Sequence, residues 1–154
     1  MDKKPRILVV DDSAIIRTAL TKQLQAYNAK ITQAGNGEQA WEQAQRADFD
    51  LIITDIEMPG LDGFSLCRRL KESRRTRGIP VIILSTSDAD KDIEQGFNVG
   101  ATAYVFKSES QTQLIDVIER VLKKSLFYRD RRVLVVDDSL VIRQLVSKAL
   151  EEAG

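Results

Sequence analysis

Five short apolar runs alternate with five amphipathic patterns between Arg6 and about Leu126. The runs are rich in valine, isoleucine and leucine, which favours strands, whereas the segments between them repeat apolar residues every three or four positions, which favours helices. The expected strands cover Arg6–Val10, Lys30–Gln33, Leu51–Asp55, Val81–Leu84 and Ala103–Phe106. Strict alternation of this kind predicts an α/β fold, in which helices cover both faces of a parallel sheet.

Local signals place the ends of the helices. Ser13 is a suitable N-cap for the first helix, and the Asn36-Gly37 and Asp62-Gly63 pairs precede the second and third. Gly100 is expected as the C-cap of a helix around Asp90–Val99, and Ser110-x-x-Gln113 resembles a capping box for the last helix.

Composition excludes several classes of function. The chain of 154 residues contains no histidine, which excludes catalytic triads, His-ligated zinc and phosphohistidine carried by this chain. Its 23 basic and 23 acidic residues balance, so the summed charge gives no reason to expect nucleic-acid or membrane binding. The single Cys67 cannot form an internal disulfide, and the N-terminus has no signal-peptide core. We therefore expect a soluble cytoplasmic protein.

Polar residues stand where the predicted strands end. Asp11 and Asp12 follow the first strand, Asp55 ends the third, Ser85 follows the fourth and Lys107 follows the fifth. In an open parallel sheet these positions meet at one edge, where functional sites gather. Three nearby carboxylates need a compensating cation, and oxygen-only ligands suit Mg²⁺. A carboxylate, a hard metal ion, a lysine and a hydroxyl together indicate phosphoryl transfer onto an aspartate.

These residues carry a resemblance to a known family. Residues from Arg6 to about Leu126 resemble the receiver domain of bacterial two-component response regulators, including the chemotaxis receiver. Relative to Asp55, the hydroxyl of Ser85 lies 30 positions on, the aromatic Tyr104 lies 49 on and Lys107 lies 52 on, as in that family. The matching motifs are Asp11-Asp12, the run from Asp55 to Gly63, Ser85, Gly100-Ala101, Tyr104 and Lys107.

The resemblance implies a fold and a metal site. The fold is a doubly wound five-stranded parallel sheet of the flavodoxin-like type, with strand order 2-1-3-4-5. Asp55 would accept a phosphoryl group from a histidine kinase. Asp12 and Asp55 would bind Mg²⁺ through their side chains, Asp11 largely through water, and Glu57 through its backbone carbonyl.

The resemblance also implies a switch. Lys107 would pair with the phosphoryl group, Ser85 would move toward it on activation, and the packing of Tyr104 would change in response. The family's variable positions near the site are Glu57 and Ser87 here, and they are expected to tune the phosphoryl lifetime. One departure is Ser108, which follows the lysine where the family commonly has a proline, often after a cis bond.

Two other functions compete with a phosphorylation-controlled switch. A Mg²⁺-dependent phosphohydrolase that forms an aspartyl phosphate would use similar groups, but it generally carries a cap insertion and an Asp-x-Asp nucleophile run. A phosphate sink without output is the third hypothesis. As partners the resemblance implies a sensor histidine kinase or phosphotransfer protein, and dimerisation of two copies through the face of the last helices and strand.

The apolar run that ends in two aspartates and a serine occurs twice, 126 positions apart. Residues 6–28 and 132–154 are identical at 11 of 23 aligned positions, and the second copy carries Asp137 and Asp138. We therefore expect a receiver domain at 1–127, a linker at 128–132, and at 133–154 the first strand and helix of a second, incomplete receiver domain. An unpaired strand there would invite association with another copy of the chain.

Overall fold

The computed structural model describes residues 3–108, 111–129 and 151–152. Strands and helices alternate along these residues. The strands are β1 (Arg6–Val10), β2 (Lys30–Ala34), β3 (Leu51–Asp55), β4 (Val81–Ser85) and β5 (Ala103–Phe106). The helices are α1 (Ala14–Ala26), α2 (Gly37–Arg46), α3 (Gly63–Glu72), α4 (Asp90–Asn98) and α5 (Gln111–Arg129). The predicted strands are all present, and β2 and β4 each extend one residue further than predicted.

The strands form one parallel sheet in the order β2-β1-β3-β4-β5. The predicted fold class and strand order are therefore confirmed. The strand order reverses at β1, because the chain crosses to β2 on one side of it and returns to β3 on the other. The loops after β1 and β3 consequently diverge at the carboxyl edge of the sheet, where ligands bind in folds of this type.

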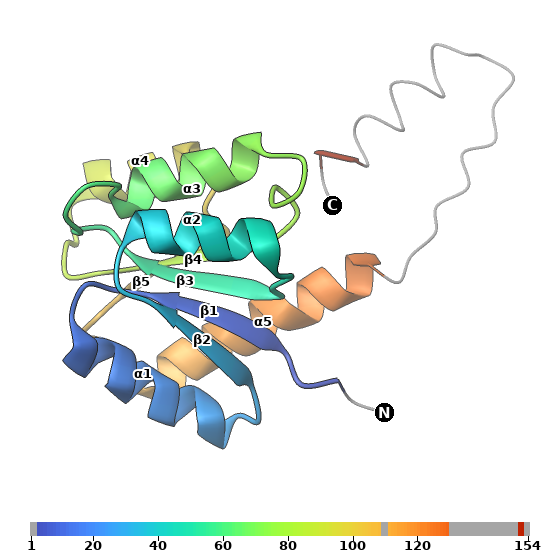
Figure 1. Cartoon of the computed structure of the whole chain (residues 1–154). Coiled ribbons are helices and arrows are strands. Elements are labelled where there is room, and N and C mark those ends of the chain that lie inside the picture. The colour runs from blue at the N-terminus through green and yellow to red at the C-terminus, as the bar shows by residue number, and fades with distance from the viewer. Residues whose placement is uncertain (1–2, 109–110, 130–150, 153–154) are drawn as a thin grey trace, which may run out of the picture.

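Two hydrophobic cores lie on the two faces of the sheet. Figure 1 shows α2, α3 and α4 over one face and α1 and α5 over the other. Side chains of successive strand residues point to opposite faces, so Ile82 packs with the core of α1 and α5 whereas Ile83 packs with that of α2 and α3. The middle strands are buried on both faces, which explains their uninterrupted apolar sequences.

The predicted N-cap Ser13 is observed, and the residues Asn36 and Asp62, expected only to break the chain, also act as N-caps. The side chains of Ser13, Asn36 and Asp62 accept hydrogen bonds from the first turns of α1, α2 and α3. Gly100 follows α4 with a φ of 100°, a left-handed conformation that glycine adopts without a Cβ penalty. The proposed capping serine, Ser110, lies outside the described residues.

The last helix is longer than the sequence pattern suggests. Helix α5 continues to Arg129, so Tyr128 and Arg129, which were expected in the linker, are helical. The second copy of the repeat, with Asp137 and Asp138, lies outside the described residues except for positions 151–152. Among the described residues, no helix is long and apolar enough to cross a membrane.

Candidate functional site

Three carboxylates meet at the carboxyl edge of the sheet. Asp11 and Asp12 follow β1, and Asp55 ends the neighbouring strand β3. One carboxylate oxygen from each lies within 4.8 Å of the others. Asp11 and Asp55 are buried, whereas Asp12 is exposed. The distances suit a hard divalent cation held by oxygen ligands, so the donor set fits the Mg²⁺ that the family resemblance implies.

Lys107 brings its ammonium to two of these carboxylates. It follows β5, two strands away from Asp55, yet its Nζ lies 3.0 Å from Asp11 Oδ2 and 3.3 Å from Asp55 Oδ2. Burial alone would lower the pKa of Lys107, but the hydrogen bond to Asp11 and the negative charges of Asp55 and Asp11 outweigh it and raise the pKa. The lysine is therefore charged at neutral pH.

Asp55 is held in an environment that disfavours its ionised form. Burial has the largest effect on its pKa and raises it, and the charge of Asp11 adds to the increase. Lys107 and the backbone N–H of Ile56, which donates to Asp55 Oδ1 at 2.8 Å, act in the opposite direction without cancelling the increase. A bound cation would relieve this penalty, because it would compensate the crowded negative charge.

Removing the lysine should therefore destabilise the fold. The Lys107→Met variant is expected to lose about 3 kcal/mol at pH 7, because two buried carboxylates lose their cation. Without Lys107 the pKa of Asp55 rises further. Ionisation of a carboxyl whose folded pKa exceeds its unfolded pKa costs stability, and that cost disappears as the pH falls through the folded pKa. The deficit should shrink toward pH 4 in urea unfolding experiments.

The matched control for this variant is Lys123→Met. Lys123 is an exposed residue of α5 whose ammonium pairs with Glu119, one turn earlier, at 3.7 Å. Its substitution should change stability by less than about 0.5 kcal/mol at either pH. Equal effects of the two substitutions would contradict the assignment of a charge-compensating contact to Lys107.

Close approach of α3 fixes the backbone beside Asp55. The N–H of Gly63, the first residue of α3, donates to the carbonyl of Ile56 at 2.9 Å. A Cβ at Gly63 would lie 2.0 Å from the carbonyl oxygen of Asp55. Only glycine permits this approach, so the predicted helix-breaking Asp62-Gly63 pair also positions the loop that follows β3.

Ser85 and Tyr104 are joined through Ser87. The hydroxyl of Ser85 is buried and accepts a hydrogen bond from the Ser87 N–H at 3.0 Å. The Tyr104 hydroxyl donates to the Ser87 carbonyl at 3.0 Å. The Ser87 hydroxyl donates to Asp92 of α4 at 2.6 Å. The hydroxyl and the aromatic ring predicted as switch residues thus share one hydrogen-bonded loop.

Gly96 makes room for the aromatic ring. A Cβ on this residue of α4 would lie 3.0 Å from the ring carbon Cδ2 of Tyr104 and 3.2 Å from Ile83 Cδ1. Burial raises the pKa of the Tyr104 hydroxyl, with smaller contributions from nearby carboxylates. The ring therefore packs against α4 beside Ile83 of β4, and its hydroxyl is protonated at neutral pH.

The remaining predicted positions are less constrained. Glu57 is exposed in the loop after β3. No peptide bond between described residues is cis, so the Lys107–Ser108 bond is trans despite the family's frequent cis-proline. Arg17 and Asp92 were not predicted to have a role, although Arg17 donates to the Asp11 carbonyl and Asp92 accepts from the Ser87 hydroxyl. The only signal for Arg17 was its recurrence as Arg143 in the repeated segment.

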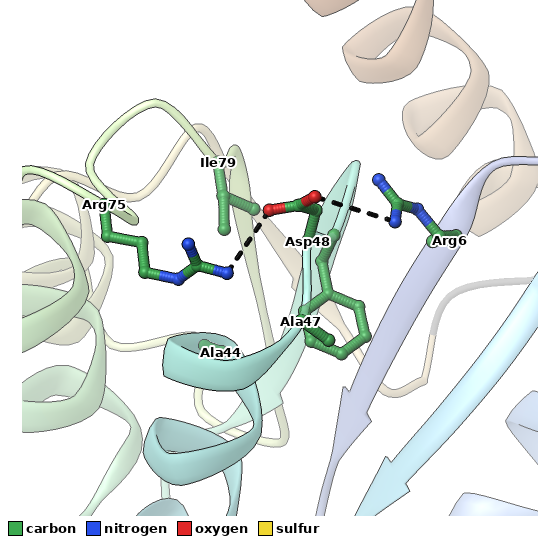
Figure 2. A pocket seen from close by; sticks show the side chains of 7 residues that line it. Arg6, Ala44, Ala47, Asp48, Arg75 and Ile79 are labelled. Carbon is green, nitrogen blue, oxygen red and sulfur yellow. Dashed lines mark hydrogen bonds and ion pairs between the residues drawn. The ribbon is translucent and has the colours of Figure 1, made fainter.

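A separate charged pocket lies at the opposite edge of the sheet, where the strands begin. Figure 2 shows Asp48 between the guanidinium groups of Arg6 and Arg75. The two ion pairs measure 3.9 Å and 3.4 Å, and the pocket has a volume of about 170 Å³. Arg6 also pairs with Asp50 at 3.8 Å, so two carboxylates compensate the two guanidinium groups. The pocket lies at the other end of the strands from Asp11, Asp12 and Asp55. We therefore assign it to the fold and not to the site.

The fold and the site together define a class of protein. A parallel sheet in the order 2-1-3-4-5, with an acidic trio and a lysine at its carboxyl edge, is the architecture of chemotaxis-type receivers. The chemotaxis response regulator CheY4 of Vibrio cholerae is similar in structure, with a TM-score of 0.73 and 30% identity. The similarity covers 77% of this chain and 99% of that chain.

Sequence comparison places the chain in a family. The family model described as the response regulator receiver domain matches residues 7–119. The chain therefore belongs to the response regulator receiver family, whose members act in phosphorylation-dependent signalling by two-component systems. Receiver domains interact with histidine kinases or phosphotransfer proteins.

Curated relatives differ in length. Protein PilH of Pseudomonas aeruginosa is 37% identical over 117 residues, which cover 76% of this chain and 97% of PilH. The gliding motility regulatory protein of Myxococcus xanthus is 42% identical over 113 residues, but these are only 14% of that protein. The chain spans about half the length of the transcriptional regulatory protein ResD of Bacillus subtilis.

Proposed function

We propose that this chain is a phosphorylation-controlled switch whose phosphoacceptor is Asp55. The observation that carries the proposal is the meeting of Asp55 with two further carboxylates and the ammonium of Lys107 at one edge of the sheet. In this reading an oxygen of Asp55 attacks phosphorus, the bond from phosphorus to the donor's histidine nitrogen breaks, and the imidazole leaves with the electron pair. The product is an acyl phosphate on Asp55.

The acidic residues would hold the cation that this transfer needs. We propose that Asp12 and Asp55 bind Mg²⁺ directly, Asp11 largely through water, and Glu57 through its carbonyl. Bound Mg²⁺ would neutralise charge on the phosphoryl oxygens. Asp11, which also binds Lys107, would keep the lysine beside the acceptor carboxylate.

Lys107 and Ser85 would respond to the phosphoryl group. The ammonium contacts Asp55 at 3.3 Å and would pair with a phosphoryl oxygen there. The Ser85 hydroxyl would donate to another oxygen, and the Ser87 N–H would then lose its present acceptor. Because the Tyr104 hydroxyl donates a hydrogen bond to the Ser87 carbonyl, movement of the loop that contains Ser87 would change the packing of the Tyr104 ring against α4. Glu57 and Ser87 would tune the phosphoryl lifetime.

The phosphodonor would approach beside Lys107. An apolar pocket of about 230 Å³ adjoins this residue, lined among others by Ile15, Phe106 and Leu114. The side chain of Ile15 is 83% exposed, which is unusual for a large apolar residue and suits contact with a partner. We propose a sensor histidine kinase or phosphotransfer protein as this partner. Dimerisation of two copies remains a prediction.

The repeated segment suggests a longer arrangement. We propose that residues 133–154, with Asp137 and Asp138, begin a second receiver domain after a first domain at 1–127 and a linker at 128–132. The identity of 11 of 23 aligned positions supports this reading.

Phosphoryl labelling tests the proposal. The chain is incubated with acetyl phosphate, with and without Mg²⁺, and its intact mass is measured over time. We expect one phosphoryl group per chain with Mg²⁺, lost on treatment with hydroxylamine, which cleaves acyl phosphates, and little labelling with EDTA. Absence of any labelled species at saturating Mg²⁺ and acetyl phosphate would refute the proposed function.

The same reaction separates a switch from an enzyme. A phosphohydrolase would release phosphate continuously from an exogenous ester such as p-nitrophenyl phosphate, whereas a switch would stop at a labelled chain that decays slowly. The position of Asp55 on β3, apart from Asp11 and Asp12 on β1, favours the switch. Sustained turnover of the ester would favour the enzyme.

A further inference from the structure

We infer that Arg17 is a positioning residue for the divalent cation, because its guanidinium fixes the peptide unit that joins Asp11 to Asp12. This inference rests on the proposed function and concerns the affinity of the site for metal. The side chain of Arg17 reaches from α1 to the loop after β1, and its Nη1 donates to the backbone carbonyl of Asp11 at 2.6 Å.

Every polar group of Asp11 has a partner. Its N–H donates to the Ala34 carbonyl at 3.3 Å, its Oδ1 accepts from the Ser13 N–H at 2.8 Å, and its Oδ2 accepts from Lys107 at 3.0 Å. The bond from Arg17 to the carbonyl completes the set. Asp11 is 1% exposed, so water competes little with these partners for its polar groups.

Asp12 has no such support of its own. It is exposed, and its side chain makes no hydrogen bond or ion pair with any residue that the structure describes. Its carboxylate nevertheless belongs to the acidic trio. The direction of that carboxylate therefore depends on the backbone before it, and the peptide unit held by Arg17 is that backbone.

Arg17 is itself held in place. Its Nε donates to Gln33 Oε1 of β2 at 3.3 Å, and Gln33 Nε2 donates to Thr21 of α1 at 2.9 Å. The guanidinium is thus fixed by a neighbouring strand before it reaches the loop. Partners of this kind, one step removed from the metal ligands, orient the ligands and set their affinity.

The helix does not explain the arginine. Arg17 is the fourth residue of α1, and a cation near a helix N-terminus opposes the helix dipole. The residue nevertheless recurs as Arg143 in the repeated segment, although most of the positions that follow Ser13 and Ser139 differ between the two copies. The hydrogen bond from Arg17 to the Asp11 carbonyl explains both why an arginine stands near the start of α1 and why it recurs in the repeated segment.

The charge of Arg17 and its hydrogen bond to Asp11 predict opposite effects on the affinity for a divalent cation, so a binding measurement can distinguish them. A guanidinium repels a divalent cation, so its removal would tighten metal binding if charge alone mattered. Loss of the bond to the Asp11 carbonyl would weaken binding, because Asp12 would lose its fixed backbone. We expect the geometric effect to prevail, because screening by water reduces repulsion at a partly exposed site.

The experiment titrates the chain with MnCl₂ and follows free Mn²⁺ by electron paramagnetic resonance, with no phosphodonor present. Arg17→Met should raise the Kd by about tenfold or more. Gln33→Ala, which removes the support of the guanidinium but keeps its charge, should raise the Kd by a smaller factor. Lys22→Ala, which removes an exposed cation of α1, is the control and should leave the Kd unchanged. At saturating Mg²⁺ the phosphorylation rate of Arg17→Met should approach that of the wild type.

Each outcome is decisive. An unchanged or lower Kd for Arg17→Met overturns the inference while leaving the proposed function intact. Failure of the wild type to bind Mn²⁺ refutes both. If Arg17→Met does not fold, Gln33→Ala decides, since a wild-type Kd for this variant also overturns the inference. Thermal unfolding without metal, measured for all variants, separates a loss of stability from a loss of affinity.

Discussion

Replacing Asp55 with asparagine is expected to abolish phosphoryl uptake from acetyl phosphate and, in the absence of divalent cations, to raise the stability of the protein at pH 7. The amide lacks a nucleophilic oxygen, so no acyl phosphate can form. The gain in stability has a separate cause. Burial raises the pKa of Asp55, so ionisation of this carboxyl costs more free energy in the folded protein than in the unfolded chain.

The pH dependence follows from the direction of this shift. The folded pKa of Asp55 lies above the unfolded pKa, so ionisation costs stability above the folded value and costs nothing below the unfolded value. The advantage of the Asp55→Asn variant should accordingly be present at pH 7 and fade toward about pH 4, where aspartic acid ordinarily titrates. Urea unfolding of both proteins across this range measures it.

Magnesium should reverse the order of stability. A ligand at ten times its Kd stabilises the folded protein by about 1.4 kcal/mol, and Asp55→Asn has lost a proposed ligand. The wild type should therefore gain more from Mg²⁺ than the variant does. Asp116→Asn removes an exposed carboxylate from α5 and is the matched control, with normal phosphorylation. Labelling of the Asp55→Asn variant at the wild-type rate would place the acceptor elsewhere.

Gly63→Ala is expected to give the largest loss of stability among the single substitutions considered. The added Cβ would stand 2.0 Å from the Asp55 carbonyl oxygen and 2.8 Å from the Cα of Ile56. These are backbone atoms, so neither can rotate away, and α3 must move relative to β3. Overpacking ordinarily costs roughly 1–3 kcal/mol, and this contact should reach or exceed the upper value.

The consequence extends to the site, because α3 abuts the residue proposed to accept the phosphoryl group. We expect slower labelling by acetyl phosphate in the fraction of Gly63→Ala that folds. Gly78→Ala is the control, since a Cβ at Gly78 would meet no atom within 4 Å. It should be neutral or stabilising by up to about 1 kcal/mol. Equal unfolding midpoints for the two variants would contradict this prediction, because they would show that the backbone after β3 shifts to accommodate the added Cβ at little cost in stability.

The features best predicted from the sequence are the strands, which follow from apolar runs, and the polar residues that stand at the strand ends. The apolar strands were placed within one residue at each end, because burial on both faces requires uninterrupted valine, isoleucine and leucine. Asp11, Asp55 and Lys107 were expected together, because parallel strands deliver their carboxyl ends to one edge. The strand order, in contrast, came from the family resemblance and not from the apolar patterns.

Other features depend on contacts that no local pattern announces. Arg17 of α1 donates a hydrogen bond to a backbone oxygen, the carbonyl of Asp11, and no sequence pattern marks such a bond. The Ser87 hydroxyl donates to Asp92, but both side chains are polar and their sequence is equally compatible with exposure to water. The extension of α5 through Tyr128 and Arg129 was not predicted, because the charged stretch that begins there was interpreted as a linker. Charged residues do not end a helix, however, and neither glycine nor proline occurs there.

The alternation of side chains along β4 provides two natural spectroscopic reporters. Ile82 and Ile83 are adjacent in the chain but belong to different cores, and both precede Ser85 by three residues or fewer. With selective methyl labelling, the NMR signal of Ile83 would sense rearrangement of Tyr104 and α4, whereas that of Ile82 would sense α5. Comparison of the two methyl signals would therefore show which of the two helical layers rearranges when the site is phosphorylated.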